Sequence, residues 1–221
     1  MRYIRIPAIL AWGVISALAW HLGSILIAPT SPMNDVVIDS ASGIWSFAAF
    51  DSLLSLVVAV PLALFGAFVL EPFLRRPFLW ALTTLAGLFV GYFSGSLISE
   101  FAFYQSAGFR GKAMWPSPYN MLLVAGLVLA LMQIPALSPR LLSSRRRIVL
   151  WVLGVPVAFA SGWLVAEVFV GGAAMQSVYN GSGLIMGAVS GTLIYGLLMV
   201  LDKKSQHIQV RAVKQGLISA E

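Results

Sequence analysis

Long apolar stretches alternate with short polar segments along almost the whole chain. They cover residues 6–28, 44–70, 78–99, 119–137, 148–170 and 179–201. Each is close to the roughly 20 residues that an α-helix needs to cross a hydrocarbon layer of about 30 Å. The pattern therefore predicts an all-α integral membrane protein, a bundle of about six transmembrane helices. We expect one membrane domain over residues 1–201 and a polar cytoplasmic tail over residues 202–221.

The first stretch has a second interpretation, because an N-terminal apolar segment is also typical of a secretory signal peptide. Its apolar run is longer than the roughly 7–15 residues of such a peptide. It ends in Leu26-Ile27-Ala28-Pro29, which lacks a small residue at the first of these positions and would place proline after the cleavage point. We therefore expect a membrane helix here.

Composition supports the membrane assignment. Hydrophobic residues make up 59% of the chain and charged residues only 10%, whereas a soluble domain carries about 25% charged residues. A soluble fold could not cover this much apolar surface. The chain has no cysteine, which excludes disulfides, thiolate nucleophiles, iron–sulfur clusters and cysteine-based zinc sites.

The basic residues are distributed unevenly between the polar segments. If the N-terminus lies inside, every lysine and arginine except Arg110 and Lys112 falls on the cytoplasmic side. The positive-inside rule therefore predicts that both termini are cytoplasmic, most simply in a bacterial inner membrane. We attribute the net charge of +6 to topology and to contact with membrane lipid, not to nucleic acid. Tryptophans near the ends of spans are expected in interfacial belts, Trp80 and Trp151 inside, Trp45 and Trp115 outside.

Two segments of the sequence resemble each other without a gap. Residues 87–100 and 154–167 share glycine, valine, serine, glycine, leucine and a final glutamate at matching positions. A Tyr-Asn pair then opens the next span in both cases, at residues 119–120 and 179–180. The third and fourth spans are therefore predicted to be a parallel copy of the fifth and sixth, an arrangement of helical-hairpin repeats that occurs in transporters and elsewhere.

Small residues recur every four positions in several spans, which places each set on one helix face. Because lipid provides little hydrophobic force between helices, close backbone approach through small residues drives their association. We expect these faces to form helix contacts, within the bundle or with a second copy or another membrane subunit; a glycine-lined pore is the alternative. The glycines concerned are Gly87, Gly91, Gly95, Gly154, Gly162, Gly183, Gly187 and Gly191.

Polar residues gather near the predicted outer ends of the spans. A carboxylate at a helix C-terminus opposes the helix dipole and needs a partner, and acids inside a membrane often mark a solute pathway. The sequence thus suggests a site for a cation or a small polar solute, with interfacial residues and asparagine helix caps as the simpler alternative. The candidate site residues are Asp51, Glu100, Asn120, Glu167, Asn180 and His21.

Little in the sequence points to catalysis, a cofactor or a bound metal. His21 is the only histidine in a span, no span contains lysine, and common hydrolase, zinc and phosphate-binding motifs are absent. An enzyme would need His21 beside Ser94, Ser161 or a carboxylate. We expect a small transporter or channel-like protein, or alternatively a non-catalytic scaffold subunit; an intramembrane enzyme is the third possibility. Convergence of the predicted polar residues on one cavity would favour the first.

Overall fold

The structure is a computed structural model that describes residues 5–30, 41–107, 118–170 and 183–214. These residues are helical apart from short linkers, and the extended backbone in them amounts to an isolated antiparallel bridge between Leu74 and Leu137. The α-helices are α1 (Arg5–Thr30), α2 (Ala41–Val69), α3 (Pro77–Ala107), α4 (Pro118–Gln133), α5 (Arg145–Val170) and α6 (Gly183–Lys214). Two short 3₁₀ helices, η2 (Glu71–Phe73) and η3 (Ile134–Ala136), follow α2 and α4.

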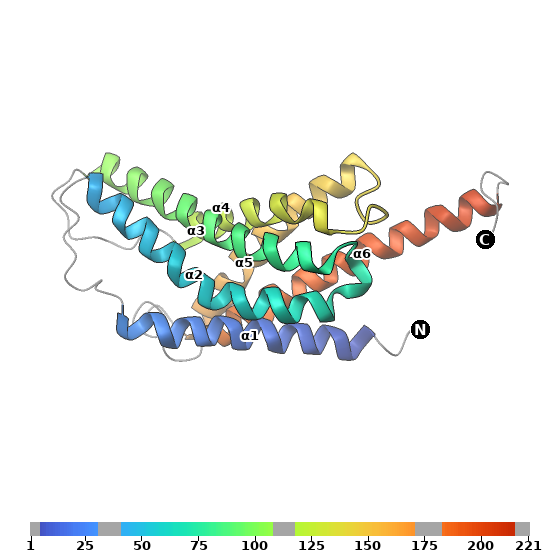
Figure 1. The fold of residues 1–221 in the computed structure, drawn as a ribbon, viewed down its shortest axis with the longest axis horizontal. Helices are drawn as coiled ribbons and strands as arrows, with labels where there is room; N and C mark the ends of the chain where they lie inside the picture. The colour runs from blue at the N-terminus through green and yellow to red at the C-terminus, as the bar shows by residue number, and fades with distance from the viewer. Residues whose placement is uncertain (1–4, 31–40, 108–117, 171–182, 215–221) are drawn as a thin grey trace.

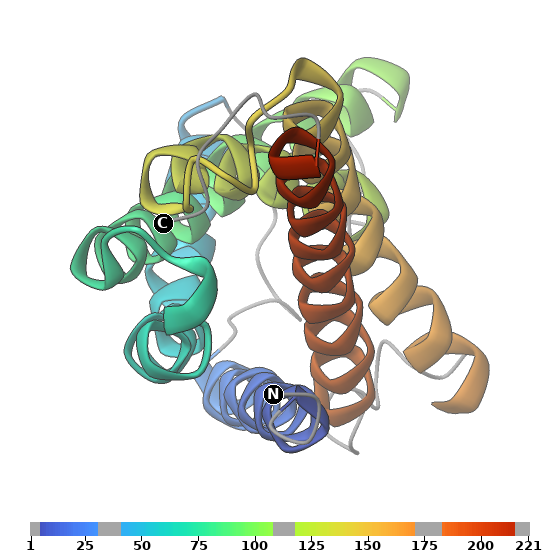
Figure 2. The same ribbon diagram turned by 90° about the vertical axis from the view of Figure 1, so that its right-hand side faces the viewer.

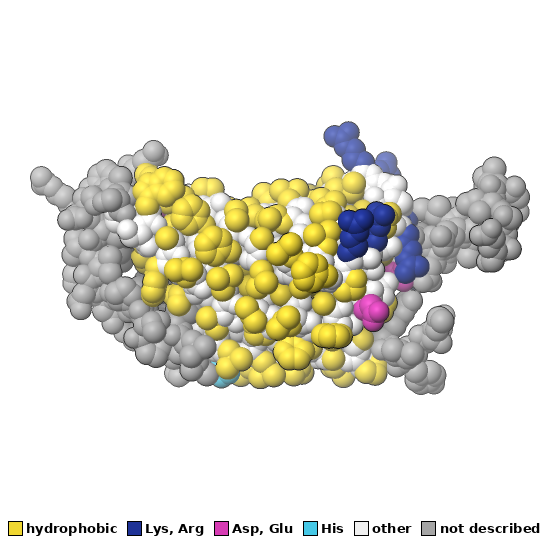
Figure 3. Space-filling view, viewed as in Figure 1, with side chains coloured by type: hydrophobic (Ala, Val, Ile, Leu, Met, Phe, Trp, Pro, Cys, Tyr) yellow, Lys and Arg dark blue, Asp and Glu magenta, His cyan; other side chains and the backbone are white. Residues whose placement is uncertain are grey.

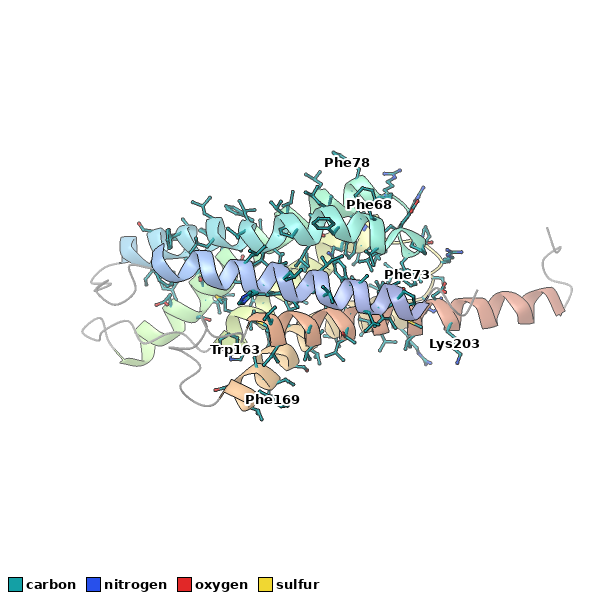
Figure 4. All side chains as sticks on the ribbon, turned by 90° about the horizontal axis from the view of Figure 1, so that it is seen from below. Phe68, Phe73, Phe78, Trp163, Phe169 and Lys203 are labelled. Atoms are coloured by element: carbon teal, nitrogen blue, oxygen red, sulfur yellow. The ribbon has the colours of Figure 1, made fainter. Side chains whose placement is uncertain are left out.

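Four helices are long and apolar enough to cross a membrane over Gly43–Val69, Pro77–Phe101, Arg145–Phe169 and Gly183–Lys203. The apolar parts of α1 and α4 are shorter, Pro7–Gly23 and Asn120–Ala136. Large apolar side chains point away from the bundle, with Phe68 78% and Phe78 83% exposed (Figure 4). The all-helical, membrane-type character expected from the sequence is therefore present, while the count of six spans stays a prediction.

The helices form a closed ring. Each helix packs against its neighbours in the chain, and α6 also packs against α1, which closes the circle (Figure 2). Successive helices run in opposite directions, so α1 begins and α6 ends at the same end of the bundle (Figure 1). We call this the terminal end. Lysine and arginine side chains gather there on the face shown in Figure 3, and hydrophobic side chains cover the described remainder of that face.

Glycines allow several of these helix pairs to approach closely. A Cβ built on Gly91 would lie 2.8 Å from Ala125 Cα, and one on Gly95 would lie 2.7 Å from the Met121 carbonyl oxygen, so α3 lies directly against the backbone of α4. Gly187 meets the backbone of Ser16 and Ala17 in the same way where α6 closes onto α1.

The two linkers at the terminal end are joined to each other. The Arg75 N–H donates to the Ala136 carbonyl at 2.9 Å, and the Ser138 N–H donates to the Phe73 carbonyl at 2.9 Å. Arg140 Nη2 also donates to the Pro72 carbonyl at 3.2 Å. These bonds satisfy backbone groups where α2 and α4 end and connect the α2–α3 linker to the α4–α5 linker across the end of the ring.

Several boundaries differ from those expected from hydropathy. α3 continues to Ala107, and α6 continues to Lys214, so residue 201 lies inside a helix. The division into a membrane domain and a cytoplasmic tail stays a prediction. At about 1.5 Å per residue, α6 is about 48 Å long and projects beyond the bundle (Figure 1). An apolar segment ends at the first run of polar residues, whereas a helix continues as long as its backbone hydrogen bonds are formed.

The inner tryptophan belt is a second difference. Trp80 and Trp151 are 2% and 0% exposed, so they pack inside the bundle and do not face lipid. Trp151 Nε1 donates to the Ala130 carbonyl at 3.0 Å, a bond from α5 to α4. Trp45, at 51% exposure, does lie on the surface as expected for an interfacial residue; Trp115 lies outside the described residues.

Candidate solute-binding cavity

A cavity lies on the axis of the ring, with room of about 30 Å³ for the centres of water-sized molecules. A single water needs about 10–15 Å³ by the same measure. Every helix of the ring contributes to its wall, so the cavity belongs to the bundle as a whole. The lining residues are Trp12, Ser16, Trp20, Leu62, Trp80, Thr84, Leu129, Gln133, Phe159, Ser190, Gly191 and Ile194.

Three lining residues carry a buried polar atom for which the protein offers no hydrogen-bond partner. The atoms are Trp12 Nε1, Trp80 Nε1 and Ser16 Oγ. A buried donor without an acceptor destabilises the fold by about 1–3 kcal/mol, which makes three of them around one cavity unusual. An indole N–H can only donate, and neither tryptophan has an acceptor within hydrogen-bond distance of its Nε1.

Other polar residues in the wall are held by protein partners. Gln133 Nε2 donates to Thr84 Oγ1 at 2.9 Å, which joins α4 to α3. Ser190 Oγ donates to the Met186 carbonyl at 2.7 Å within α6. Gly66 on α2 makes room for both indoles, since a Cβ there would lie 2.9 Å from Trp80 Nε1 and 3.0 Å from the ring of Trp12. The polar groups of Gln133 and Ser190 are thus held by the protein, and the surface that the wall presents to the cavity is almost entirely apolar.

Ionisable side chains are missing from the lining of this cavity. A charged solute in such a low-dielectric space would have no counter-charge, which is strongly unfavourable. Among the described residues, no group of three or more His, Asp or Glu side chains could hold a metal ion. The cavity thus suits a small uncharged molecule.

Aromatic rings cover the cavity on the side away from the terminal end. Trp20 on α1 packs against Tyr92 on α3, with ring centroids 6.2 Å apart, and against Phe159 on α5 at 5.9 Å. Helices α3 and α5 are not ring neighbours of α1, so both contacts cross the interior of the ring. We call Trp20, Tyr92 and Phe159 the outer aromatic layer.

A second aromatic contact crosses the ring on the terminal side. Phe73 in η2 packs edge-on against Tyr195 in α6, with centroids 5.5 Å apart. Tyr195 follows the lining residue Ile194, and both rings are buried, at 7% and 3% exposure. We call Phe73 and Tyr195 the inner aromatic layer. Each of the two aromatic layers therefore joins elements from different sides of the ring.

Of the site residues that the sequence suggested, those whose side chains the structure describes do not line this cavity. Glu100 is 1% exposed, Glu167 is half-buried and Asn120 is exposed. His21 is half-buried, and its Nδ1 has no hydrogen-bond partner. Asn180 and the side chain of Asp51 lie outside the described residues. The convergence of these groups on a cavity of their own stays a prediction.

Sequence reasoning overlooked the cavity residues for an identifiable reason. Trp80 was expected at the lipid interface, and the single serines, threonines and glutamine in the spans were too ordinary to stand out. A usable signal was present: Gln133 and Thr84 are polar side chains within apolar spans, at similar distances from the predicted inner ends. The sequence shows how far Gln133 and Thr84 lie from the inner ends of their spans, but it does not show that both side chains face each other inside the bundle.

Comparisons with protein-family models, with curated proteins and with solved structures found no match for this chain. Its function is therefore argued from the cavity itself.

Proposed function

We propose that all six helices cross the membrane and that the terminal end faces the cytoplasm. The described α1 and α4 occupy places in the same ring as the four helices that meet the length and hydropathy expected of a span. Their approximately antiparallel order leaves no room for a helix that turns back. The arginines of both linkers, Arg75, Arg76, Arg140, Arg145 and Arg146, are exposed at the terminal end, which supports this orientation by the positive-inside rule.

The absence of cysteine in the natural chain makes this topology simple to test. Ser144→Cys and Gly111→Cys place one thiol in the α4–α5 linker or in the segment between α3 and α4. In intact cells, an impermeant maleimide should label the second variant only. Labelling of Ser144→Cys alone would show that the orientation is the reverse of the one proposed. Labelling of both variants or of neither would refute the six-span topology.

We further propose that the protein is a small transporter for a small polar solute, with the central cavity as its binding site. The observation that supports this best is the cavity itself, to which all six described α-helices contribute and whose wall carries no ionisable side chain. A packing scaffold has no need of buried unpartnered donors, which lower its stability. Opening one layer while the other stays closed would give the solute access from one side at a time, as transporters require.

The cavity favours an uncharged solute over the cation that the outer acids suggested. An indole N–H can donate to a carbonyl, amide or hydroxyl oxygen and cannot coordinate a cation. The small volume limits the solute in this closed state to a few non-hydrogen atoms. The outer acids Glu100 and Glu167 then have a structural or an access role rather than a binding role.

The experiment is solute flux into proteoliposomes with urea, formamide and glycerol as uncharged probes and with Na⁺ and K⁺ as charged ones. We expect flux of at least one uncharged probe above that of empty vesicles, and none of the cations. Trp80→Phe and Trp12→Phe should each reduce that flux about tenfold, the equivalent of one hydrogen bond. Trp45→Phe is the matched control, because Trp45 is 51% exposed on the surface, and its flux should equal wild type.

Two outcomes would contradict the proposal. Cation flux without flux of the uncharged probes would show that the cavity is not the binding site. Unchanged flux in both cavity variants would show that any transport follows another path. No flux of any probe, together with unchanged intrinsic fluorescence of Trp12 and Trp80 on addition of each solute, would contradict the transporter hypothesis. The scaffold hypothesis would then be the better explanation.

A further inference from the structure

Arg147 is a buried arginine in the first turn of α5. It is 4% exposed, whereas the adjacent Arg145 and Arg146 are both exposed. Its Nη1 donates to the Arg140 carbonyl at 2.8 Å and to Ser143 Oγ at 3.0 Å. The guanidinium group therefore lies against the linker that enters α5, next to the N-terminus of that helix.

Among the described residues, no carboxylate is hydrogen-bonded to Arg147. Nη2 is buried and has no hydrogen-bond partner, and Nη1 contacts only a neutral carbonyl and a neutral hydroxyl. A buried guanidinium without a counter-charge is costly, because ion burial is compensated only by close opposite charge and full hydrogen bonding. Arginine most often meets this need with a carboxylate or a phosphate, which its planar group binds through two parallel bonds.

The surroundings favour an anion over an unrecognised protein acid. The first turn of α5 carries the positive end of the helix dipole, while the N–H groups of Arg147 and Ile148 are bonded to the Ser144 carbonyl. Arg140, Arg145 and Arg146 add three exposed positive charges. Two acids are described near this end, Glu71, exposed in the neighbouring linker, and Asp202, 8% exposed on α6. Neither is hydrogen-bonded to Arg147.

The surface beyond this turn is apolar and suited to lipid chains. Val149, Leu150 and Leu153 follow directly on α5 and are 46%, 42% and 57% exposed. A basic turn at the end of a helix that continues as an exposed apolar face matches the two parts of a phospholipid, with the phosphate at the turn and the acyl chains along the helix. A free phosphate would use only the first part.

We propose that the first turn of α5 is a binding site for the phosphodiester of an anionic phospholipid, with Arg147 Nη2 as its buried donor. Arg145 and Arg146 contact the outer oxygens of the headgroup. Access to Nη2 needs a shift of the exposed Ser143 and Ser144, which releases the Arg147–Ser143 bond and exchanges a hydroxyl for a charged acceptor. This site is independent of the central cavity and of what the cavity carries.

The test is native mass spectrometry and thermal unfolding of delipidated protein with phosphatidylglycerol, phosphatidylcholine or inorganic phosphate. We expect phosphatidylglycerol to bind and to raise the unfolding temperature, while the other two do neither. Arg147→Gln should weaken phosphatidylglycerol binding at least tenfold, as expected for the loss of a charge-assisted hydrogen bond. The control Arg75→Gln/Arg76→Gln removes two exposed charges at the same end and should change affinity less than about threefold, as exposed charges do.

A second measurement keeps the proposal falsifiable if Arg147→Gln does not fold. A photoreactive phosphatidylglycerol should crosslink to residues 140–150 of the wild-type protein, and unlabelled phosphatidylglycerol should compete. Crosslinking spread evenly over the helix ends would overturn the site. Equal loss in Arg147→Gln and in the control would show general surface attraction only, and equal stabilisation by inorganic phosphate would show that the site takes a free anion and not a lipid.

Discussion

The α3–α4 and α5–α6 pairs begin from nearly the same sequence pattern but use it differently. In α3, Gly91 and Gly95 face the backbone of α4 at 2.8 and 2.7 Å. In α5, Gly162 faces the Met186 carbonyl at 2.6 Å, but Gly154 faces only the Leu197 side chain, and the position that matches Gly91 is Ala158. A small residue is indispensable where it meets backbone, because backbone cannot move aside, and is replaceable where it meets a flexible side chain.

The matching glutamates differ in the same way. Glu100 in α3 is 1% exposed, and the hydroxyl of Ser99 beside it is buried as well, whereas Glu167 in α5 is only half-buried. Equivalent places in a repeated sequence therefore have different surroundings in the folded bundle. The repeat itself stays a prediction. The comparison shows that the residues of its α3 copy are more deeply buried or closer to a neighbouring backbone than their α5 counterparts at the positions of Gly91 and Glu100.

The largest effect should come from a large side chain at the α3–α4 contact. Gly91→Leu and Gly95→Leu should each destabilise the protein by about 3 kcal/mol, the upper end for overpacking, because α4 backbone occupies the space. Gly196→Leu is the control, since a Cβ there meets nothing within 4 Å. Yield and monodispersity in size-exclusion chromatography measure this, and normal behaviour of both α3 variants would disprove the close approach.

The two glutamates should differ next. Glu100→Ala is expected to lose about 2 kcal/mol, because it empties a buried site and strands its partner, while Glu167→Ala should lose less than about 1 kcal/mol. Thermal or denaturant unfolding in detergent gives both values. Equal losses would mean that the two acids are equally buried in solution.

An exchange of the middle residue of each stripe gives a smaller, more specific effect. Gly91→Ala should destabilise by about 1–2 kcal/mol through contact with Ala125, and Ala158→Gly by about 1 kcal/mol through lost packing and added backbone freedom. Unfolding midpoints of the two variants against wild type would show this. A stabilising Gly91→Ala would indicate that the α3–α4 pair is as loosely packed as α5–α6.

The smallest effect concerns glycines without a backbone contact. Gly196→Ala should stabilise the helix by about 0.5–1 kcal/mol, since it removes glycine from a helix interior. Gly154→Ala should gain the same stabilisation, but the new Cβ would lie 2.5 Å from Leu197 Cδ2 and displace that side chain. The net change in the free energy of unfolding should therefore be near zero. Unfolding midpoints in parallel would separate the two, and a clear loss in Gly154→Ala would mean that Leu197 cannot move.

Much of the architecture follows from local sequence. Hydropathy alone located all the helices that the structure describes, since a run of about 20 apolar residues has few alternatives to a helix in lipid. Glycine spacing predicted which faces are small, because four residues return to the same side of a helix. Boundaries were less accurate: α6 extends to Lys214, where polar side chains hide a helix from a hydropathy scan.

What the sequence determined by itself is the class of this protein, its apolar helices and the basic character of one end. The tertiary structure alone decided that α6 closes onto α1, that Glu100 is buried while Glu167 is not, and that Trp12, Trp80 and Ser16 surround a cavity between two aromatic layers. The physical reason is that helix formation and lipid solvation act on neighbouring residues. A cavity depends instead on how each helix is rotated about its axis, and that rotation is set by packing between residues far apart in the chain.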